Sequence, residues 1–195
     1  ASDSPALVDD SSPSRSRERL LDLFADTGED IDDGNYNCVD GSSDTRCGLR
    51  DAFKTVSRSR NRDTFRVFLR QGETYDWEAS SVELDIGESS VQVLSVGNDP
   101  LSEGQSIIRG GSNGFLRILS GNITFEGVTF THFDTKEVFS LEGARSSLNL
   151  QRGAGSDLRS TFVKGAKGSD VEISNYEISD TAVNGNRLID MFSSS

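Results

Sequence analysis

Residues 115–130 read FLRILSGNITFEGVTF, and this stretch decides the fold class of the chain. It holds two runs rich in apolar residues, Phe115–Leu119 and Ile123–Phe130, on either side of Ser120-Gly121-Asn122. Short apolar runs bounded by turn-forming residues are typical of β-strands. The stretch therefore predicts two consecutive strands.

The same pattern continues on both sides of this stretch. From Thr64 onward, short runs rich in Val, Ile, Phe and Leu alternate with Gly, Ser, Asn and Asp, which makes this part of the chain all-β. The other predicted strands are Phe65–Leu69, Val82–Ile86, Val91–Val96, Ser106–Ile108, Val138–Leu141, Ser147–Leu150, Thr161–Val163, Val171–Ile178 and Leu188–Phe192.

The predicted strands recur at a regular interval of about 23 to 26 residues. A period of this length, with several short strands in each unit, is typical of a β-solenoid, whose coils bury their inner faces against neighbouring coils. A β-sandwich would show hairpin turns about every 8 to 12 residues instead. The positions that align at this interval are Phe115, Phe139, Phe162 and Leu188 in one set, and Ile123, Leu148 and Val171 in the other.

One helix is predicted ahead of the strands. Its apolar residues are spaced at i, i+3, i+4 and i+7, the pattern of a single buried helical face. These residues are Leu49, Ala52, Phe53 and Val56. We expect a short helix over Leu49–Val56.

Residues 1–35 are polar and acidic, and we expect them to form a largely flexible tail because they have little apolar surface to bury. Within this tail, Leu20–Phe24 predicts one helical turn or a short strand that covers the end of the core, with a partner-binding motif as the alternative. The run Arg15–Arg19 predicts a solvated basic patch, with a processing site or an anion contact as the alternatives.

The charge of the chain limits its partners. With 32 acidic and 20 basic residues the formal net charge is -12, which disfavours sequence-independent binding to nucleic acid. The longest apolar stretches fall far short of the roughly 20 residues that a membrane-spanning helix needs, so we expect a soluble protein. The chain starts at Ala1 without a signal-peptide pattern, which indicates a mature chain or a fragment.

Cys38 and Cys47 are the two cysteines of the chain, and they flank a polar loop that contains glycine. A disulfide is the favoured interpretation because a zinc site would need four ligands, and the single histidine, His132, lies far away in the sequence. A disulfide in turn indicates an oxidising compartment, either outside the cell, in the periplasm or in the lumen of an organelle.

The segment around these cysteines resembles a known signature. It runs Asp32-Asp33-Gly34-Asn35-Tyr36-Asn37-Cys38 and, after the loop, Cys47-Gly48-Leu49-Arg50-Asp51-Ala52-Phe53. This is similar to the "CSLREA" signature of extracellular right-handed parallel β-helix proteins, in which an Asp- and Gly-rich loop with a cysteine precedes Cys-Ser-Leu-Arg-Glu-Ala-Ile. Gly48, Asp51 and Phe53 depart from that signature. The strand Asp63–Leu69 and the segment Gly72–Tyr75 are similar to the family's first strand and Gly-Thr-Tyr turn, with Glu73 as an extra residue.

Further along, four segments look like successive coils of the pectate-lyase-like superfamily: Val91–Gly97, Ile107–Gly111, Phe115–Ile118 and Asn122–Phe130. The resemblance covers roughly residues 30–192. It implies a right-handed parallel β-helix of about five or six coils, with the Leu49–Val56 helix covering the N-terminal edge. Lyases, hydrolases, adhesins and structural proteins share this fold, so the resemblance does not imply one function.

Catalytic residues cannot be assigned from the sequence. The resemblance would imply an Arg or Lys beside Asp or Glu calcium ligands in a lyase, or four short motifs in a polygalacturonase, and none of those four motifs is present. The adjacent acidic pairs Asp9-Asp10 and Asp32-Asp33 lie outside the coils, so a glycosidase carboxylate pair is not predicted. His132 has no nucleophile pattern beside it and is interpreted as a surface residue. A lyase-like face or, as we favour, a set of solvated charges would be formed by Arg109, Arg117, Lys136, Asp85, Glu126 and Glu137.

Three weaker features complete the candidate sites. The carboxylates of Asp30, Asp32 and Asp33 are a weak candidate for calcium, without the full spacing of an EF-hand loop. Asn122-Ile123-Thr124 is a glycosylation sequon that matters in a eukaryotic secretory protein. A set of phenylalanines is interpreted as an internal stack rather than a sugar-binding strip. The set is Phe125, Phe130, Phe133, Phe139 and Phe162.

The sequence therefore predicts a non-catalytic extracellular structural or adhesive module without a cofactor. Its expected parts are the tail 1–35, a disulfide loop and helix over 36–62, and β-helix coils over 63–195. The last predicted strand looks like the start of another coil, so the C-terminal coil end, the tail or both are expected to join a larger assembly of protein subunits. The alternative is a polysaccharide lyase-like enzyme or glycan-binding module for acidic polysaccharides, which a net charge of -12 disfavours unless calcium bridges the two.

Overall fold

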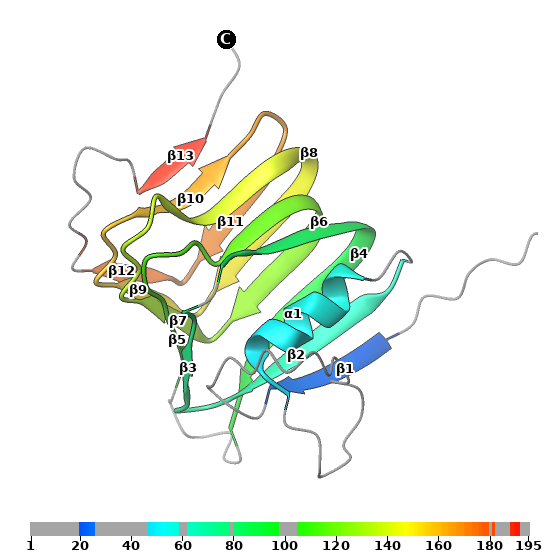
Figure 1. The fold of residues 1–195 in the computed structure, drawn as a ribbon, viewed down its shortest axis with the longest axis horizontal. Coiled ribbons are helices and arrows are strands. Elements are labelled where there is room, and N and C mark those ends of the chain that lie inside the picture. The colour runs from blue at the N-terminus through cyan, green and yellow to red at the C-terminus, as the bar shows by residue number, and fades with distance from the viewer. Residues whose placement is uncertain are drawn as a thin grey trace, which may run out of the picture.

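The computed structural model describes residues 20–25, 47–58, 62–78, 80–97, 105–179, 181 and 188–191. These residues form one short helix and two all-parallel sheets, wound one after the other into a solenoid (Figure 1). The helix is α1 (Leu49–Ser57). The strands are β1 (Leu20–Ala25), β2 (Thr64–Arg70), β3 (Thr74–Asp76), β4 (Val82–Val96), β5 (Ser106–Arg109), β6 (Leu116–Glu126), β7 (Val128–Thr131), β8 (Glu137–Gln151), β9 (Ala154–Ser156), β10 (Thr161–Gly165), β11 (Asp170–Ser174), β12 (Glu177–Ser179) and β13 (Ile189–Met191).

The large sheet has the order β1-β2-β4-β6-β8-β10-β13, and β11 also pairs with β8. The small sheet has the order β12-β9-β7-β5-β3. The large sheet has two arms, and the long strands β4, β6 and β8 run through both of them. Their C-terminal halves lie between β2 and β11 in what we call the first arm, and their N-terminal halves lead to β10 and β13 in the second arm. The all-parallel pairing confirms the predicted parallel β-helix fold class.

One of the two predicted repeat alignments is confirmed residue for residue. Ile123 pairs with Leu148, and Leu148 pairs with Val171. In the other alignment Phe139 is wrong by one residue, because it pairs with Leu116 and Val163. Val138, Phe139, Ser140 and Leu141 are all buried, so an alternating apolar pattern could not fix the register there.

Corners between the sheets explain where the predicted strand boundaries differ. Gly127, Arg152 and Asn175 each have a positive φ, and they directly follow the stacked residues Glu126, Gln151 and Ser174. The left-handed conformation turns the chain from the large sheet toward the small one at the same place in successive coils. The predicted strand Ile123–Phe130 is therefore divided between β6 and β7, and Val171–Ile178 between β11 and β12.

Two further differences concern strand length. The predicted strands Val82–Ile86 and Val91–Val96 form the single strand β4, which shifts register between its halves. The three-residue strands β3 and β9 were not predicted. Three residues are too few to show an alternating pattern, and both strands are held by parallel pairing, β3 with β5 and β9 with β7.

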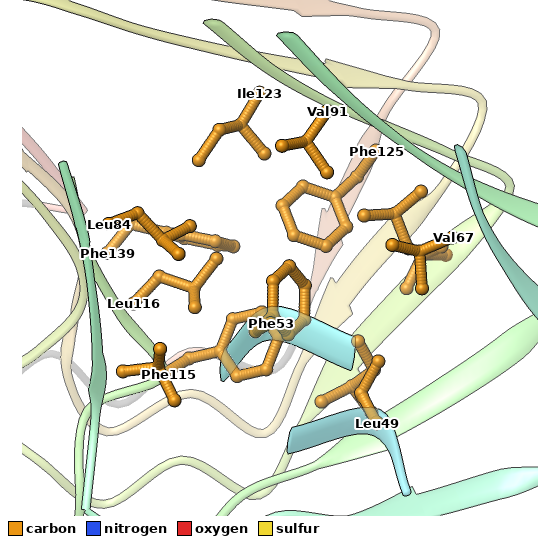
Figure 2. Close-up of a cluster of buried hydrophobic side chains, with 14 of the residues drawn as sticks. Leu49, Phe53, Val67, Leu84, Val91, Phe115, Leu116, Ile123, Phe125 and Phe139 are labelled. Carbon is orange, nitrogen blue, oxygen red and sulfur yellow. The ribbon is translucent and has the colours of Figure 1, made fainter. Parts of the chain in front are cut away.

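The interior is a stack of aromatic rings. The five phenylalanines predicted to be internal are fully buried, which confirms that interpretation. Phe115 lies at the centre of the stack, with edge-to-face contacts to Trp77, Phe130 and Phe139. Apolar residues of α1 and of both sheets converge on this stack. Figure 2 shows how Phe53 of α1 lies against Phe115 and close to residues of the large sheet such as Phe125.

The predicted helix is confirmed and extends one residue further, to Ser57. Its four predicted core residues are buried, and Phe53 reaches into the stack against Phe115 at 5.5 Å between ring centroids. The helix lies against β4 and β1 and so covers the interior at the N-terminal end of the solenoid. The edge of the large sheet at this end is formed by the strand β1, so of the alternatives for Leu20–Phe24 the short strand is the correct one. No helix among the described residues is long and apolar enough to cross a membrane.

Candidate functional site

The structure separates the charged residues that the sequence grouped as a lyase-like face. Arg109 lies on β5 of the small sheet and donates to both carboxylate oxygens of Asp76, at 2.6 and 2.9 Å. Arg117 lies on β6 of the large sheet. It donates twice to Glu142, at 3.0 and 2.7 Å, and once to Glu83 at 3.1 Å. The two arginines therefore point from different sheets, and each has its own carboxylate partners.

The remaining members of that set also have separate partners. Asp85 accepts a hydrogen bond from Ser120. Glu126 pairs with Arg152, and Glu137 pairs with Lys164 at 3.8 Å. Lys136 is exposed between β7 and β8. The arrangement matches solvated charge pairs between coils.

Hydrogen bonding in these pairs favours the charged forms. The bonds donated by Arg117 hold the pKa of Glu142 below its ordinary value and raise the pKa of Arg117. Asp76 raises the pKa of Arg109 in the same way.

His132 has partners that the sequence did not indicate. Its Nδ1 lies 2.8 Å from the hydroxyl of Thr131, and its Nε2 lies 3.2 Å from a carboxylate oxygen of Asp157. His132 and Asp157 both have a positive φ and follow the paired residues Thr131 and Ser156, so they stack at a second corner. The side chains of His132 and Asp157 are 60% and 44% exposed, and this openness makes the group a corner contact rather than an enclosed catalytic site.

The metal and disulfide candidates lie mainly outside the described residues. Asp30, Asp32, Asp33 and Cys38 are all outside them, so the calcium site and the Cys38–Cys47 pairing stay predictions. Cys47 is buried two residues before the start of α1. Within the described ranges, no group of three or more His, Cys, Asp and Glu side chains is arranged to hold a metal ion.

Part of the outer face of the first arm is polar and uncharged over three neighbouring strands. Its side chains lie in two rows that cross β4, β6 and β8. The rows are Ser90, Asn122 and Ser147, and Gln92, Thr124 and Asn149. Asn122 and Gln92 are exposed, so the sequon residue faces outward from the sheet.

The C-terminal end of the solenoid exposes residues that belong to the core pattern. Ile189 follows Phe139 and Val163 in register, and both of these are fully buried. Ile189 itself is 39% exposed and Met191 is 36% exposed. Val171, Ile173 and Ile178 are only partly buried. Among the described residues, these side chains have no following coil to cover them.

Carboxylates surround this apolar end. β11, β12 and β13 each pair on one side only within the described part of the chain, so their outer edges present backbone donors and acceptors. Their acidic residues, which we call the acidic rim, are Asp170, Glu172, Glu177 and Asp190. Sequence reasoning anticipated the open strand but not the rim, because only the coil geometry brings the three strands to one end.

At the opposite end the interior is covered, although β1 and β3 each pair on one side only within the described part of the chain. Leu23 of β1 is fully buried, and so are Phe53 and Val56 of α1. Both ends of the solenoid therefore have open strand edges, but α1 and β1 cover the interior at the N-terminal end, whereas apolar side chains and carboxylates are exposed at the C-terminal end.

Comparison of the chain with known protein families, with curated proteins and with solved structures found no match. The class that the fold defines is the parallel β-helix, from its two parallel sheets and internal aromatic stack. The narrower resemblance to the pectate-lyase-like superfamily and its CSLREA signature stays a prediction.

Proposed function

We propose that the chain is a non-catalytic structural or adhesive β-helix module that joins a larger assembly through the C-terminal end of its solenoid. The observation that carries this proposal is the exposure of Ile189 and Met191 at positions where preceding coils are buried. Uncovered apolar side chains beside open strand edges favour association with another β-structure.

The proposed location is the cell exterior or another oxidising compartment. Two sequence features support it: the resemblance of residues 32–53 to an extracellular signature, and the pairing predicted for Cys38 and Cys47. The proposed partners are protein subunits of the same surface or luminal assembly.

The test is the native mass of the chain in its source extract, with calcium and with a chelator. A complex that survives chelation supports the proposal, and Ile189→Asp should reduce its mass toward 21.2 kDa. Val96→Asp is the matched control. Val96 is a β-branched apolar residue like Ile189 and is exposed to a similar degree, 42% against 39%, but it lies on β4 away from the C-terminal strands. A chain that is monomeric in its source extract, both with calcium and with a chelator, would contradict the proposal.

Glycan binding is the second candidate function, and the two uncharged rows on the outer face of the first arm favour it. Amide and hydroxyl groups in two regular rows can hydrogen-bond to sugar hydroxyls without the desolvation cost of a charge. Gln92→Ala and Thr124→Ala should each weaken retention on a polysaccharide matrix, with Ser179→Ala of β12 as the control. Retention on an acidic polysaccharide only when calcium is present would identify calcium as the bridge, whereas equal retention of all three variants would exclude this face.

A further inference from the structure

The two edges of the first arm continue the same rows of inward-facing residues. One row begins at Leu21 and passes through Phe65, Val91, Ile123 and Leu148 to Val171. The next row begins at Leu23 and ends at Ile173 in the same way. The edge strands β1 and β11 run in the same direction, so a second copy stacked along the solenoid axis would continue the sheet.

The two edge strands also carry the same chemical pattern. β1 contains Leu21-Asp22-Leu23, and β11 contains Val171-Glu172-Ile173. In both, an acidic residue faces outward between two apolar residues that face inward. β1 therefore places against β2 the same pattern of side chains that β11 of another copy would place there.

β2 has a specific partner for that acidic residue. Arg66 donates to both carboxylate oxygens of Asp22, at 2.8 and 2.7 Å, and its guanidinium lies over the ring of Phe68 at 5.4 Å. This bidentate geometry suits any carboxylate placed opposite Arg66 on the neighbouring strand. Glu172 of a second copy would occupy that place if its β11 lay on β2 in the register of β1.

β1 is held on β2 by contacts that come from its own side chains and backbone. Phe24 stacks on Phe68 at 5.0 Å, and the hydroxyl of Tyr75 donates to the carbonyl of Ala25 at 3.0 Å. No tight turn joins the two strands, because the chain passes through α1 between Ala25 and Thr64. β1 can therefore leave β2 without breaking the turn geometry of the coils.

We infer that β1 is a built-in cap that imitates the C-terminal edge of a second copy. While β1 covers β2, β11 of a second copy would have to pair with β1 and place Glu172 opposite Asp22, and this like-charge contact disfavours head-to-tail stacking of identical chains. When β1 leaves, β11 of another copy adds to β2, Glu172 takes the place of Asp22 opposite Arg66, and Val171 and Ile173 are covered. This inference rests on the proposed assembly through the C-terminal end and names its partner.

The charges explain why the stacking is head-to-tail. Two C-terminal ends would bring Asp170 and Glu172 of one copy against the same residues of the other, which costs free energy. A C-terminal end against an uncovered β2 pairs Glu172 with Arg66 instead. Because the contact joins two different surfaces, a stacked pair still has one free N-terminal end and one free C-terminal end. Further copies can add in the same way to form chains of more than two copies.

The test uses full-length variants in sedimentation equilibrium over a range of concentrations. Asp22→Arg replaces an attractive contact with Arg66 by a repulsive one, and we expect the mass to rise from 21.2 kDa toward multiples of that value. Asp22→Arg combined with Arg66→Glu restores the pair with reversed charges and should return the protein to monomer. Asp22→Arg combined with Glu172→Arg removes the carboxylate that replaces Asp22 and should also remain monomeric.

A peptide covering residues 15–26 provides an independent measurement on Asp22→Arg. An excess of this peptide should compete for β2 and dissolve the assemblies, whereas the same peptide with arginine at the position of Asp22 should not. Circular dichroism checks that each variant is folded. If folded Asp22→Arg stays monomeric, or if Glu172→Arg does not prevent its assembly, the capping role of β1 is wrong. A wild-type chain that joins a complex with other proteins would still support the proposed function in either case.

Discussion

Replacing Phe115 should be the most damaging single truncation in the aromatic stack. Phe115 is fully buried, and its ring contacts six other rings at centroid distances from 4.6 Å for Trp77 to 6.4 Å for Phe133. These rings come from α1, from both sheets and from the loops between strands, so they cannot all move in to fill the space left by alanine.

The expected cost of Phe115→Ala is about 4 to 5 kcal/mol, the upper part of the range for buried Phe to Ala changes, because several favourable ring pairs are lost together. For a chain of this size that lowers the melting temperature by roughly 8 to 20 °C. Urea unfolding measures the change in free energy, with Phe24→Ala as the matched control. Phe24 is 46% exposed and has one stacked partner, so its replacement should cost only about 1 kcal/mol.

Equal losses for Phe115→Ala and Phe24→Ala would refute the reasoning, because the stack would then not contribute more to stability than a surface pair does.

Four further predictions concern close packing, pH, the disulfide and the sequon. A Cβ on Gly143 would overlap the carbonyl oxygen of Leu119, so Gly143→Ala should lower the free energy of unfolding, measured in urea, by about 2 to 3 kcal/mol. A Cβ on Gly111 would meet no other atom, so the control Gly111→Ala should change this free energy by no more than about 0.5 kcal/mol. Burial raises the pKa of Tyr176, whose hydroxyl donates to the carbonyl of Ala154 at 2.6 Å. The contribution of Tyr176 to stability is therefore complete below its ordinary pKa of 10.0 and is lost as the pH rises through its raised pKa in the folded protein. The free energies of unfolding of wild type and Tyr176→Phe, measured against pH, should change differently above pH 10.0, and parallel pH dependences would contradict this. Reduction of the predicted Cys38–Cys47 disulfide should cost about 2 to 3 kcal/mol, and two reactive thiols per chain in the unreduced, denatured protein would show that the bond does not form. Expression in a eukaryotic secretory host should add a glycan at Asn122 that Thr124→Ala removes, measured as a mass difference; identical masses would show that the sequon is not used.

Much of the fold could be predicted because it depends on local patterns. The helix followed from the spacing of Leu49, Ala52, Phe53 and Val56, and the stacking of Ile123, Leu148 and Val171 followed from their period. The short strands β3 and β9 could not be predicted, because parallel pairing with neighbouring coils holds them. Phe139 was placed one residue out because Val138 beside it is equally buried.

The candidate site was predicted in outline only. The last predicted strand, at Leu188, indicated an open coil end. The sequence could not show that Arg109 and Arg117 belong to different sheets, or that Asp157 lies beside His132, because these relations depend on how the coils turn at residues with a positive φ.

By itself, the sequence determined that this protein is a solenoid, because a repeated apolar pattern specifies coils that bury one another whatever lies at the ends. It also determined the net charge of -12 and the lack of an assignable catalytic set of residues. Only the tertiary structure decided which apolar residues stay uncovered and which charges meet. Ile189 and Met191 are exposed because they lie at the end of the stack, and Arg66 holds Asp22 across 44 residues of chain because the winding places β1 beside β2. Burial and ion pairing depend on neighbours in space, and in a solenoid those neighbours come from the coil before and the coil after.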